Sequence, residues 1–162
     1  MTKYPRVPPP LDRVFASNPV FFVTVCTYRR RPLLATDPLH NAFVQFSHRA
    51  YEEHGIAVGR YVIMPNHIHL FVCGPNHFEL GRWMGMLKRC LQRVVALPAS
   101  PAGRRLQKTP IWQRRFFDHV LRNDESYPHK WEYVRDNPLH AGLVANADNW
   151  PYAGKIITID RI

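Results

Sequence analysis

Residues 57–73, AVGRYVIMPNHIHLFVC, place the tightest limit on how this chain can fold. Two short apolar runs, 57–63 and 67–73, are separated only by Met-Pro-Asn, and this spacing predicts a β-hairpin. The second run carries His67 and His69 among branched and aromatic apolar residues. Side chains two positions apart in a strand point to the same face. The two imidazoles are therefore predicted to lie side by side.

Two interpretations of the histidine pair are open from the sequence. The imidazoles could be structural, half-buried and bonded to the backbone, or they could chelate a divalent metal ion. A zinc site would usually need further Cys or His ligands. No such ligand stands at a matching spacing, and Cys26, Cys73 and Cys90 are far apart without a CxxC pair. An incomplete two-histidine site suits Mg²⁺ or Mn²⁺, which also accept water and phosphate oxygens.

The rest of the chain alternates strand-like and helix-like patterns. We expect strands at 20–28 and 111–121, helices at 38–54, 78–97 and 124–137, and a loop at 98–110. The first helix is expected to begin with Asp37 as N-cap before Pro38 and to end at Gly55. The last is expected to end at Asn137, because proline disfavours helix in the residue before it.

The order β-α-β-β-α-β-α predicts an α+β fold of the ferredoxin-like, split β-α-β type. Its antiparallel sheet would carry helices on one face and an added C-terminal helix. We expect a single domain over 19–154, between a proline-rich N-terminal tail at 1–18 and a C-terminal tail at 155–162.

The last predicted helix contains a second unusual pair, Tyr133 and Asn137. They are four residues apart and so share one helix face. A phenol there could attack a phosphorus atom, and the amide oxygen could help to hold a metal ion. The alternative is that Tyr133 packs in the core and Asn137 only ends the helix before Pro138.

Basic residues dominate the chain, with 22 Lys and Arg against 12 Asp and Glu and a formal net charge of +10. This balance favours a polyanionic partner, above all nucleic acid. No acidic residue lies between position 82 and position 115. Aromatic residues are interleaved with this charge, as in surfaces that bind single-stranded nucleic acid. The candidate DNA-binding residues are Arg82, Lys88, Arg89, Arg93, Arg104, Arg105, Arg114 and Arg115.

Three stretches together resemble one known family. YVIMPNHIHLFV, WQRRFFDHVLRNDES and YVRDNPLHAGLV, in this order, are similar to the REP-associated tyrosine transposases, single-tyrosine members of the HUH endonuclease superfamily. FFVTVCTYRRRPLL and NWPYAG resemble the same family, so the similarity runs from about Val20 to Tyr152.

The resemblance implies a role for each matching residue. His67 and His69 correspond to the metal-binding histidines of the HUH motif, and Tyr133 corresponds to the nucleophilic tyrosine. Asn137 stands where many relatives carry a glutamine that is a third metal ligand. The resemblance further implies a transposase that nicks hairpin-forming single-stranded DNA, such as palindromic repeats, through a 5′-phosphotyrosine, with Mg²⁺ or Mn²⁺ as cofactor.

Other functions remain open at this level. The chain could be a non-catalytic single-stranded nucleic-acid-binding protein derived from such a transposase, or a protein with a structural metal. No apolar run is long enough to span a bilayer, so we expect no membrane association and a cytoplasmic location. The protein is expected to be a monomer or a homodimer.

Overall fold

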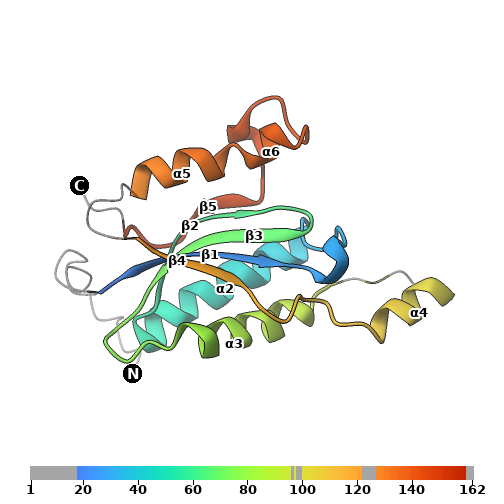
Figure 1. Ribbon diagram of the computed structural model, residues 1–162, viewed down its shortest axis with the longest axis horizontal. Helices are drawn as coiled ribbons and strands as arrows, with labels where there is room; N and C mark the ends of the chain where they lie inside the picture. The colour runs from blue at the N-terminus through green and yellow to red at the C-terminus, as the bar shows by residue number, and fades with distance from the viewer. Residues whose placement is uncertain (1–17, 96, 98–99, 122–126, 160–162) are drawn as a thin grey trace, which may run out of the picture.

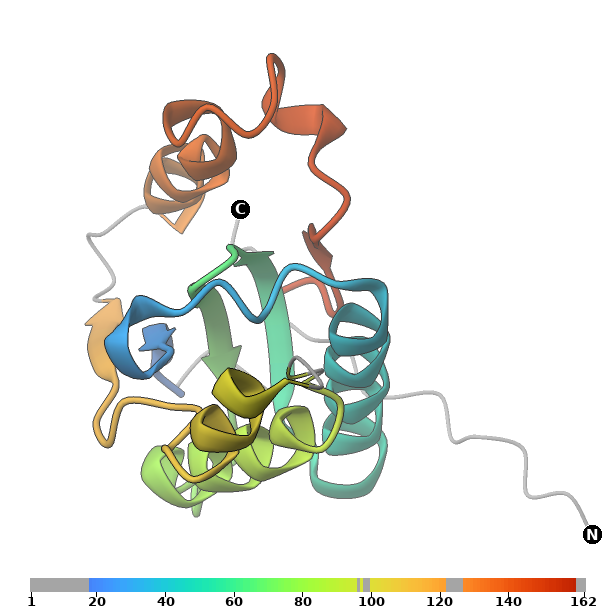
Figure 2. The same cartoon turned by 90° about the vertical axis from the view of Figure 1, so that its right-hand side faces the viewer.

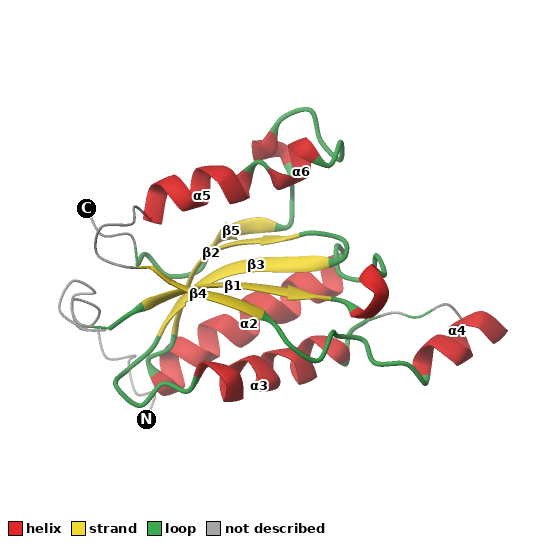
Figure 3. Cartoon of the chain, in the orientation of Figure 1, coloured by secondary structure: helices red, strands yellow, loops and turns green. Residues whose placement is uncertain are grey.

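The computed structural model describes residues 18–95, 97, 100–121 and 127–159. The N-terminal tail expected at 1–18 lies outside these residues, except for Asn18. A five-stranded antiparallel sheet forms the centre, with the strand order β4-β1-β3-β2-β5 (Figure 3). Its strands are β1 Val20–Cys26, β2 Ala57–Ile63, β3 His67–Cys73, β4 Phe117–Leu121 and β5 Ala153–Lys155. The α+β, ferredoxin-like prediction is confirmed, and β5 extends the sheet beyond β2.

Helices cover both faces of the sheet. Helices α2 (Asp37–His54) and α3 (Leu80–Gln92) lie on one face. The opposite face carries α5 (Tyr127–Arg135), followed by α6 (Asn137–His140). Figure 1 and Figure 2 show the sheet between these two layers. Helix α5, which carries Tyr133, therefore covers the face of the sheet that α2 and α3 leave uncovered.

Alternation along β3 divides its side chains between these layers. Ile68, Leu70 and Val72 belong to the main core, with Leu87 of α3 among its other members. Phe71 and Cys73 point the other way and belong to a smaller cluster with Tyr127 and Ile159. Burial of the apolar set on the α2 and α3 side thereby fixes which face the histidines occupy.

The hairpin is predicted correctly, since β2 and β3 have the expected bounds and the Met64 N–H donates to the His67 carbonyl at 2.8 Å. Helix α2 also ends as expected, at Gly55 with φ of 67°. Its N-cap, however, is Thr36, whose hydroxyl accepts from the Leu39 N–H. Asp37 is therefore the first helical residue, and Pro38 occupies the second position. Proline is tolerated in the first turn, where its missing N–H would have no partner within the helix.

Several expected bounds are wrong. Helix α3 ends at Gln92 instead of 97, and the loop expected at 98–110 contains helix α4, Pro101–Gln107. The Ser100 hydroxyl accepts from the Gly103 N–H at 3.0 Å, so a Ser-Pro pair begins this helix. Figure 1 shows α4 projecting beyond the end of α3. Strand β4 begins only at Phe117, although Trp112 forms an isolated bridge with Thr27.

The C-terminal elements also differ from the prediction. Helix α5 ends at Arg135, and Asn137 with Pro138 begins α6 instead of ending a helix. The tail expected from residue 155 is part of the fold as far as Ile159, because Lys155 belongs to β5 and Ile159 is only 4% exposed. Short 3₁₀ turns at Tyr28–Arg30 (η1) and Ala147–Asn149 (η2) complete the chain. None of the helices in the described ranges is long and apolar enough to cross a membrane.

Gly59 of β2 marks where α5 rests on the sheet. A Cβ there would lie 2.6 Å from the Tyr127 hydroxyl and 2.7 Å from Ile159. The same hydroxyl accepts the Arg60 N–H at 2.9 Å. The close approach of α5 and Ile159 to β2 therefore depends on the absence of a side chain at Gly59.

We expect Gly59→Ala to lower the free energy of unfolding by about 1–3 kcal/mol, because the added methyl overpacks this contact. Gly81→Ala on α3 is the matched control, since no atom lies within 4 Å of its added Cβ. The control should be neutral or more stable by up to about 1 kcal/mol. Urea unfolding measures both. Equal stability of the two variants would show that α5 does not rest on β2 at Gly59.

Candidate active site

The two histidines lie side by side on the central strand, as the sequence predicts. His69 pairs with Thr24 of β1 and with Val62 of β2, and His67 pairs with Cys26. The ring centroids of His67 and His69 are 4.7 Å apart, with the planes at 80°. Both side chains are half-buried. Because β3 has neighbours on both sides, the strand holds the pair rigidly.

One nitrogen of each imidazole is engaged by a neighbouring side chain. The His67 Nδ1 lies 2.7 Å from Asn66 Oδ1, and the His69 Nδ1 lies 2.7 Å from Thr24 Oγ1. An amide oxygen only accepts, so the His67 Nδ1 carries the proton and its Nε2 keeps a lone pair. Such partners fix ring orientation and tautomer in metal-binding histidines. The Nε2 atoms are the positions at which this pair could bind a metal ion.

Both imidazoles are neutral at physiological pH. Burial lowers the pKa of His67 to about 4, and the nearby Arg30 adds to this effect. Burial also lowers the pKa of His69 to about 3, with smaller contributions from His67, Lys130 and Arg30. Neutral imidazole is the form that binds metals. Among the described residues, no group of three His, Cys, Asp or Glu side chains is arranged to hold a metal ion.

An aromatic ring joins the histidine pair to α5. Phe22 of β1 stacks on His69, with centroids 5.4 Å apart and planes at 17°. The Lys130 ammonium of α5 lies 4.9 Å from the centre of the Phe22 ring. This contact places the Lys130 face of α5 next to the histidine pair.

Tyr133 follows Lys130 by three residues and therefore lies one helical turn along the same side of α5. Its side chain is 71% exposed. The neighbouring Val134 is buried against Val62 and Met64, so the helix is fixed to the sheet at this point. Asn137 is half-buried at the start of α6. Within the described residues, neither Tyr133 nor Asn137 has a hydrogen bond to His67 or His69.

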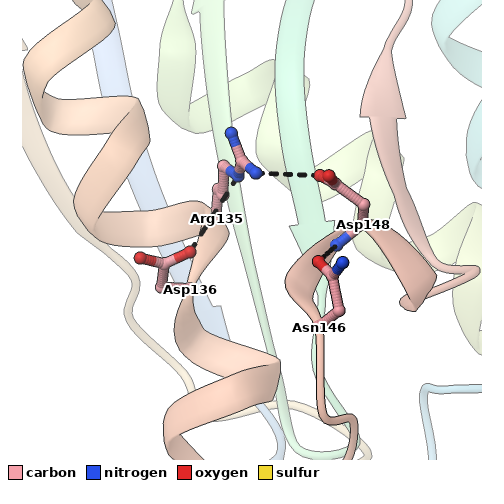
Figure 4. A network of polar contacts seen from close by, with 4 residues as sticks. All are labelled: Arg135, Asp136, Asn146 and Asp148. Atoms are coloured by element: carbon pink, nitrogen blue, oxygen red, sulfur yellow. Dashed lines mark hydrogen bonds and ion pairs between the residues drawn. The ribbon is translucent and has the colours of Figure 1, made fainter.

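The segment after the tyrosine helix ties it to the sheet. The Arg135 guanidinium donates to Asp148 at 2.8 Å and lies 3.9 Å from Asp136 (Figure 4). Asn146 accepts the Asp148 N–H at 3.0 Å. The Trp150 indole packs in the cluster of Val134 and donates to the Ile63 carbonyl at 3.0 Å. The exposed ion pairs contribute little, so the Trp150 contacts are the main anchor.

The predicted basic residues occupy other elements. Arg82, Lys88 and Arg89 lie on α3, Arg93 caps it, Arg104 and Arg105 lie on α4, and Arg114 and Arg115 precede β4. All are exposed except Lys88, whose ammonium donates to the Gln113 carbonyl at 3.0 Å. Helix α3 covers the sheet face opposite the histidines. The α3 residues of this basic set are therefore not brought together with the histidine pair.

The aromatic residues of this basic segment divide into two groups. Trp83 and Trp112 are 4% and 7% exposed and belong to the core, so they are not stacking surfaces. Phe117 is 72% exposed on the edge strand β4. Only Phe117 among these three therefore presents a ring to solvent.

Sequence reasoning missed the partners of the histidines. Thr24 is the one polar residue in VFFVTVC, and Asn66 directly precedes His67. Thr24 is two residues from Phe22 and so shares its strand face. A polar residue at that position was the feature of the sequence that could have identified it. Lys130 had no signal of its own, because only the packing of α5 brings it close to Phe22.

Comparisons with known proteins identify the family of the chain. The family model described as transposase IS200-like matches residues 17–137. A REP-associated tyrosine transposase of Escherichia coli K12 is 26% identical over 148 residues, covering 87% of this chain and 79% of the relative. A Haemophilus influenzae protein given the same family name is 28% identical over 145 residues, covering 87% and 82%.

A solved structure shares the fold. It is described as a REP-associated tyrosine transposase bound to a REP hairpin, and it superposes with a TM-score of 0.62 at 22% identity. The match covers 94% of this chain and 82% of the solved chain. Since the family model matches residues 17–137, a range that includes His67, His69 and Tyr133, the chain belongs to the IS200-like transposase family.

Proposed function

We propose that this protein is a metal-dependent single-stranded DNA endonuclease and strand transferase that nicks hairpin DNA through a 5′-phosphotyrosine. The observation that carries the proposal is the neutral His67 and His69 pair, with each Nδ1 engaged, on the sheet face covered by the helix of Tyr133. The hairpin-bound structure with the same fold supports hairpin DNA as the partner.

His67 and His69 would hold Mg²⁺ or Mn²⁺ through Nε2, with Asn137 as a further candidate ligand. Two nitrogen ligands leave the other coordination positions to water and phosphate oxygens. The metal would supply polarisation of the scissile phosphate and would offset charge that develops in the transition state. Half-burial of the imidazoles keeps them neutral, so protons do not compete for their lone pairs near pH 7.

Tyr133 would act as the nucleophile. Its phenolic oxygen attacks phosphorus in line, the bond from phosphorus to the 3′-oxygen breaks, and the departing oxygen takes up a proton as a 3′-hydroxyl. The phenolic proton is lost, and a 5′-phosphotyrosine remains. Attack by a 3′-hydroxyl on this intermediate reverses the step and joins strands without a separate energy source. The 71% exposure of Tyr133 leaves room for a DNA strand to reach it.

The first test is a covalent-adduct assay with Tyr133→Phe. Labelled hairpin DNA from repeats flanking the gene is incubated with protein and Mg²⁺ or Mn²⁺, and a denaturing gel reports the adduct. We expect the adduct to disappear in the variant while hairpin binding changes less than about threefold, because only the nucleophilic oxygen is removed. Tyr28→Phe is the control and should retain the adduct.

An adduct that persists in Tyr133→Phe would exclude this tyrosine as the nucleophile. Tight, salt-sensitive binding without an adduct in the unmodified protein would instead support a nucleic-acid-binding protein without nuclease activity.

The metal role is tested with His67→Ala combined with His69→Ala, and with chelator on the unmodified protein. Both treatments should remove the adduct, because the scissile phosphate loses its Lewis acid. Added Mn²⁺ should restore the chelated protein and leave the double variant inactive. The matched control is His48→Ala combined with His54→Ala, which removes two exposed imidazoles from α2. Unchanged adduct yield in the His67 and His69 variant would contradict the metal role.

The basic surface is tested with Arg89→Ala combined with Arg93→Ala. We expect weaker hairpin binding and a less steep dependence of log K on log salt, by about 0.7–0.9 for each phosphate that the variant no longer neutralises. Fluorescence anisotropy at several salt concentrations measures both quantities. Arg49→Ala combined with Lys155→Ala removes the same net charge from α2 and β5 as a control. An unchanged slope in the Arg89 and Arg93 variant would remove α3 from the DNA surface.

A further inference from the structure

Among the described residues, the surroundings of the histidine pair carry positive charge that no carboxylate pairs with. The Arg30 guanidinium donates to the Cys26 sulfur at 2.7 Å, and Cys26 is the β1 partner of His67. Arg30 and Lys130 are the charged side chains that act on His69. In the described part of the chain, neither forms an ion pair with an acidic residue. Ordinary magnesium sites contain carboxylates, which offset the charge of the ion. A cation that enters this site alone meets two neutral ligands and two repelling charges.

Arg30 is held beside the pair by an unusual backbone conformation. Arg29 and Arg30 have φ of 56° and 54°, a left-handed conformation that is unfavourable for a residue with a side chain. The buried Thr27 stabilises this turn, since its hydroxyl contacts the carbonyls of Arg31 at 2.8 Å and Asn66 at 3.2 Å. Asn66 is also the partner of His67. The arginine turn and the histidine ring are therefore positioned by connected hydrogen bonds.

Lys130 approaches from the opposite layer. Its ammonium lies over Phe22, and Phe22 stacks on His69. A cation over an aromatic face is stabilised without being neutralised. Lys130 also lies one turn before Tyr133 on the same side of α5. Arg30 from the β1 end and Lys130 from α5 thus flank the histidine pair.

We infer that Arg30 and Lys130 bind the phosphate group that reaches the histidine pair, so that the divalent metal and the DNA strand bind there cooperatively. The inference rests on the proposed function and assigns two further residues to it. Arginine and lysine are the usual phosphate-binding side chains. An arriving phosphate supplies the negative charge that the described residues do not place beside the pair. By reciprocity, metal must then tighten DNA binding by the factor by which DNA tightens metal binding.

The test measures Mn²⁺ affinity by electron paramagnetic resonance, in a Tyr133→Phe background that prevents cleavage. Affinity is determined with and without hairpin DNA from the repeats flanking the gene. We expect Mn²⁺ to bind at least about tenfold more tightly when DNA is present. Lys130→Met should tighten Mn²⁺ binding to the free protein by about fivefold, because a repelling charge is removed. In the same variant, hairpin DNA should raise Mn²⁺ affinity by a smaller factor than in the parent.

In Lys130→Met, Mn²⁺ affinity of the free protein should rise while the increase in affinity caused by DNA should fall. This pattern distinguishes an electrostatic effect from damage to the fold, which would lower both. Lys130→Arg should behave as the parent does, and Lys155→Met is the control for net charge. Arg30→Met, with Arg49→Met as its control, repeats the experiment from the other side of the pair.

The outcomes distinguish this inference from the proposed function. Mn²⁺ binding that needs His67 and His69 but is indifferent to DNA, Arg30 and Lys130 would overturn only the inference. Absence of Mn²⁺ binding with and without DNA would overturn the metal role and the inference together. A DNA-induced gain that Lys130→Met and Arg30→Met leave intact would show that other residues bind the phosphate.

Discussion

The alternation of β3 between two unlike layers is the constraint on which the site depends. Ile68, Leu70 and Val72 are fully buried against the α2 and α3 layer. A shift of one residue in register would exchange this set for His67, His69 and Phe71. Two imidazoles would then enter an apolar core without their Asn66 and Thr24 partners, at a cost of several kcal/mol. Packing on one face of the sheet thereby holds the histidine pair on the other.

This constraint explains which predictions succeed. The hairpin and its histidines are fixed by local alternation and by the Met-Pro-Asn connection, and both are visible in the sequence. Helix α4 and strand β5 are not visible in the same way. Among the residues of α4 whose burial is described, only Gly103 is buried, so no buried apolar face marks this helix. The three residues of β5 are a strand only because β2 offers them a free edge.

The site follows the same division. Residue type and spacing identify His67, His69, Tyr133 and Asn137 as candidates, and the structure places the histidines together. Thr24, Asn66 and Lys130 become recognisable only through cross-strand register or layer packing. The aromatic residues show the opposite failure. Trp83 and Trp112 are of a residue type that stacks on nucleic-acid bases, yet both are buried in the core. Sequence alone does not distinguish a ring that points inward from one that points outward.

In the proposed reaction, the two layers therefore contribute different things. The strand layer supplies rigidity, since β3 lies between β1 and β2 and the imidazoles are fixed at Nδ1. The α5 layer supplies an exposed phenol and a cation, held by Val134, Trp131 and the Trp150 indole. A nucleophile buried like the histidines would be out of reach of a DNA strand, and ligands exposed like Tyr133 would lose their orientation. Separation of the two tasks between a buried strand and an exposed helix face allows both demands to be met in a single small domain.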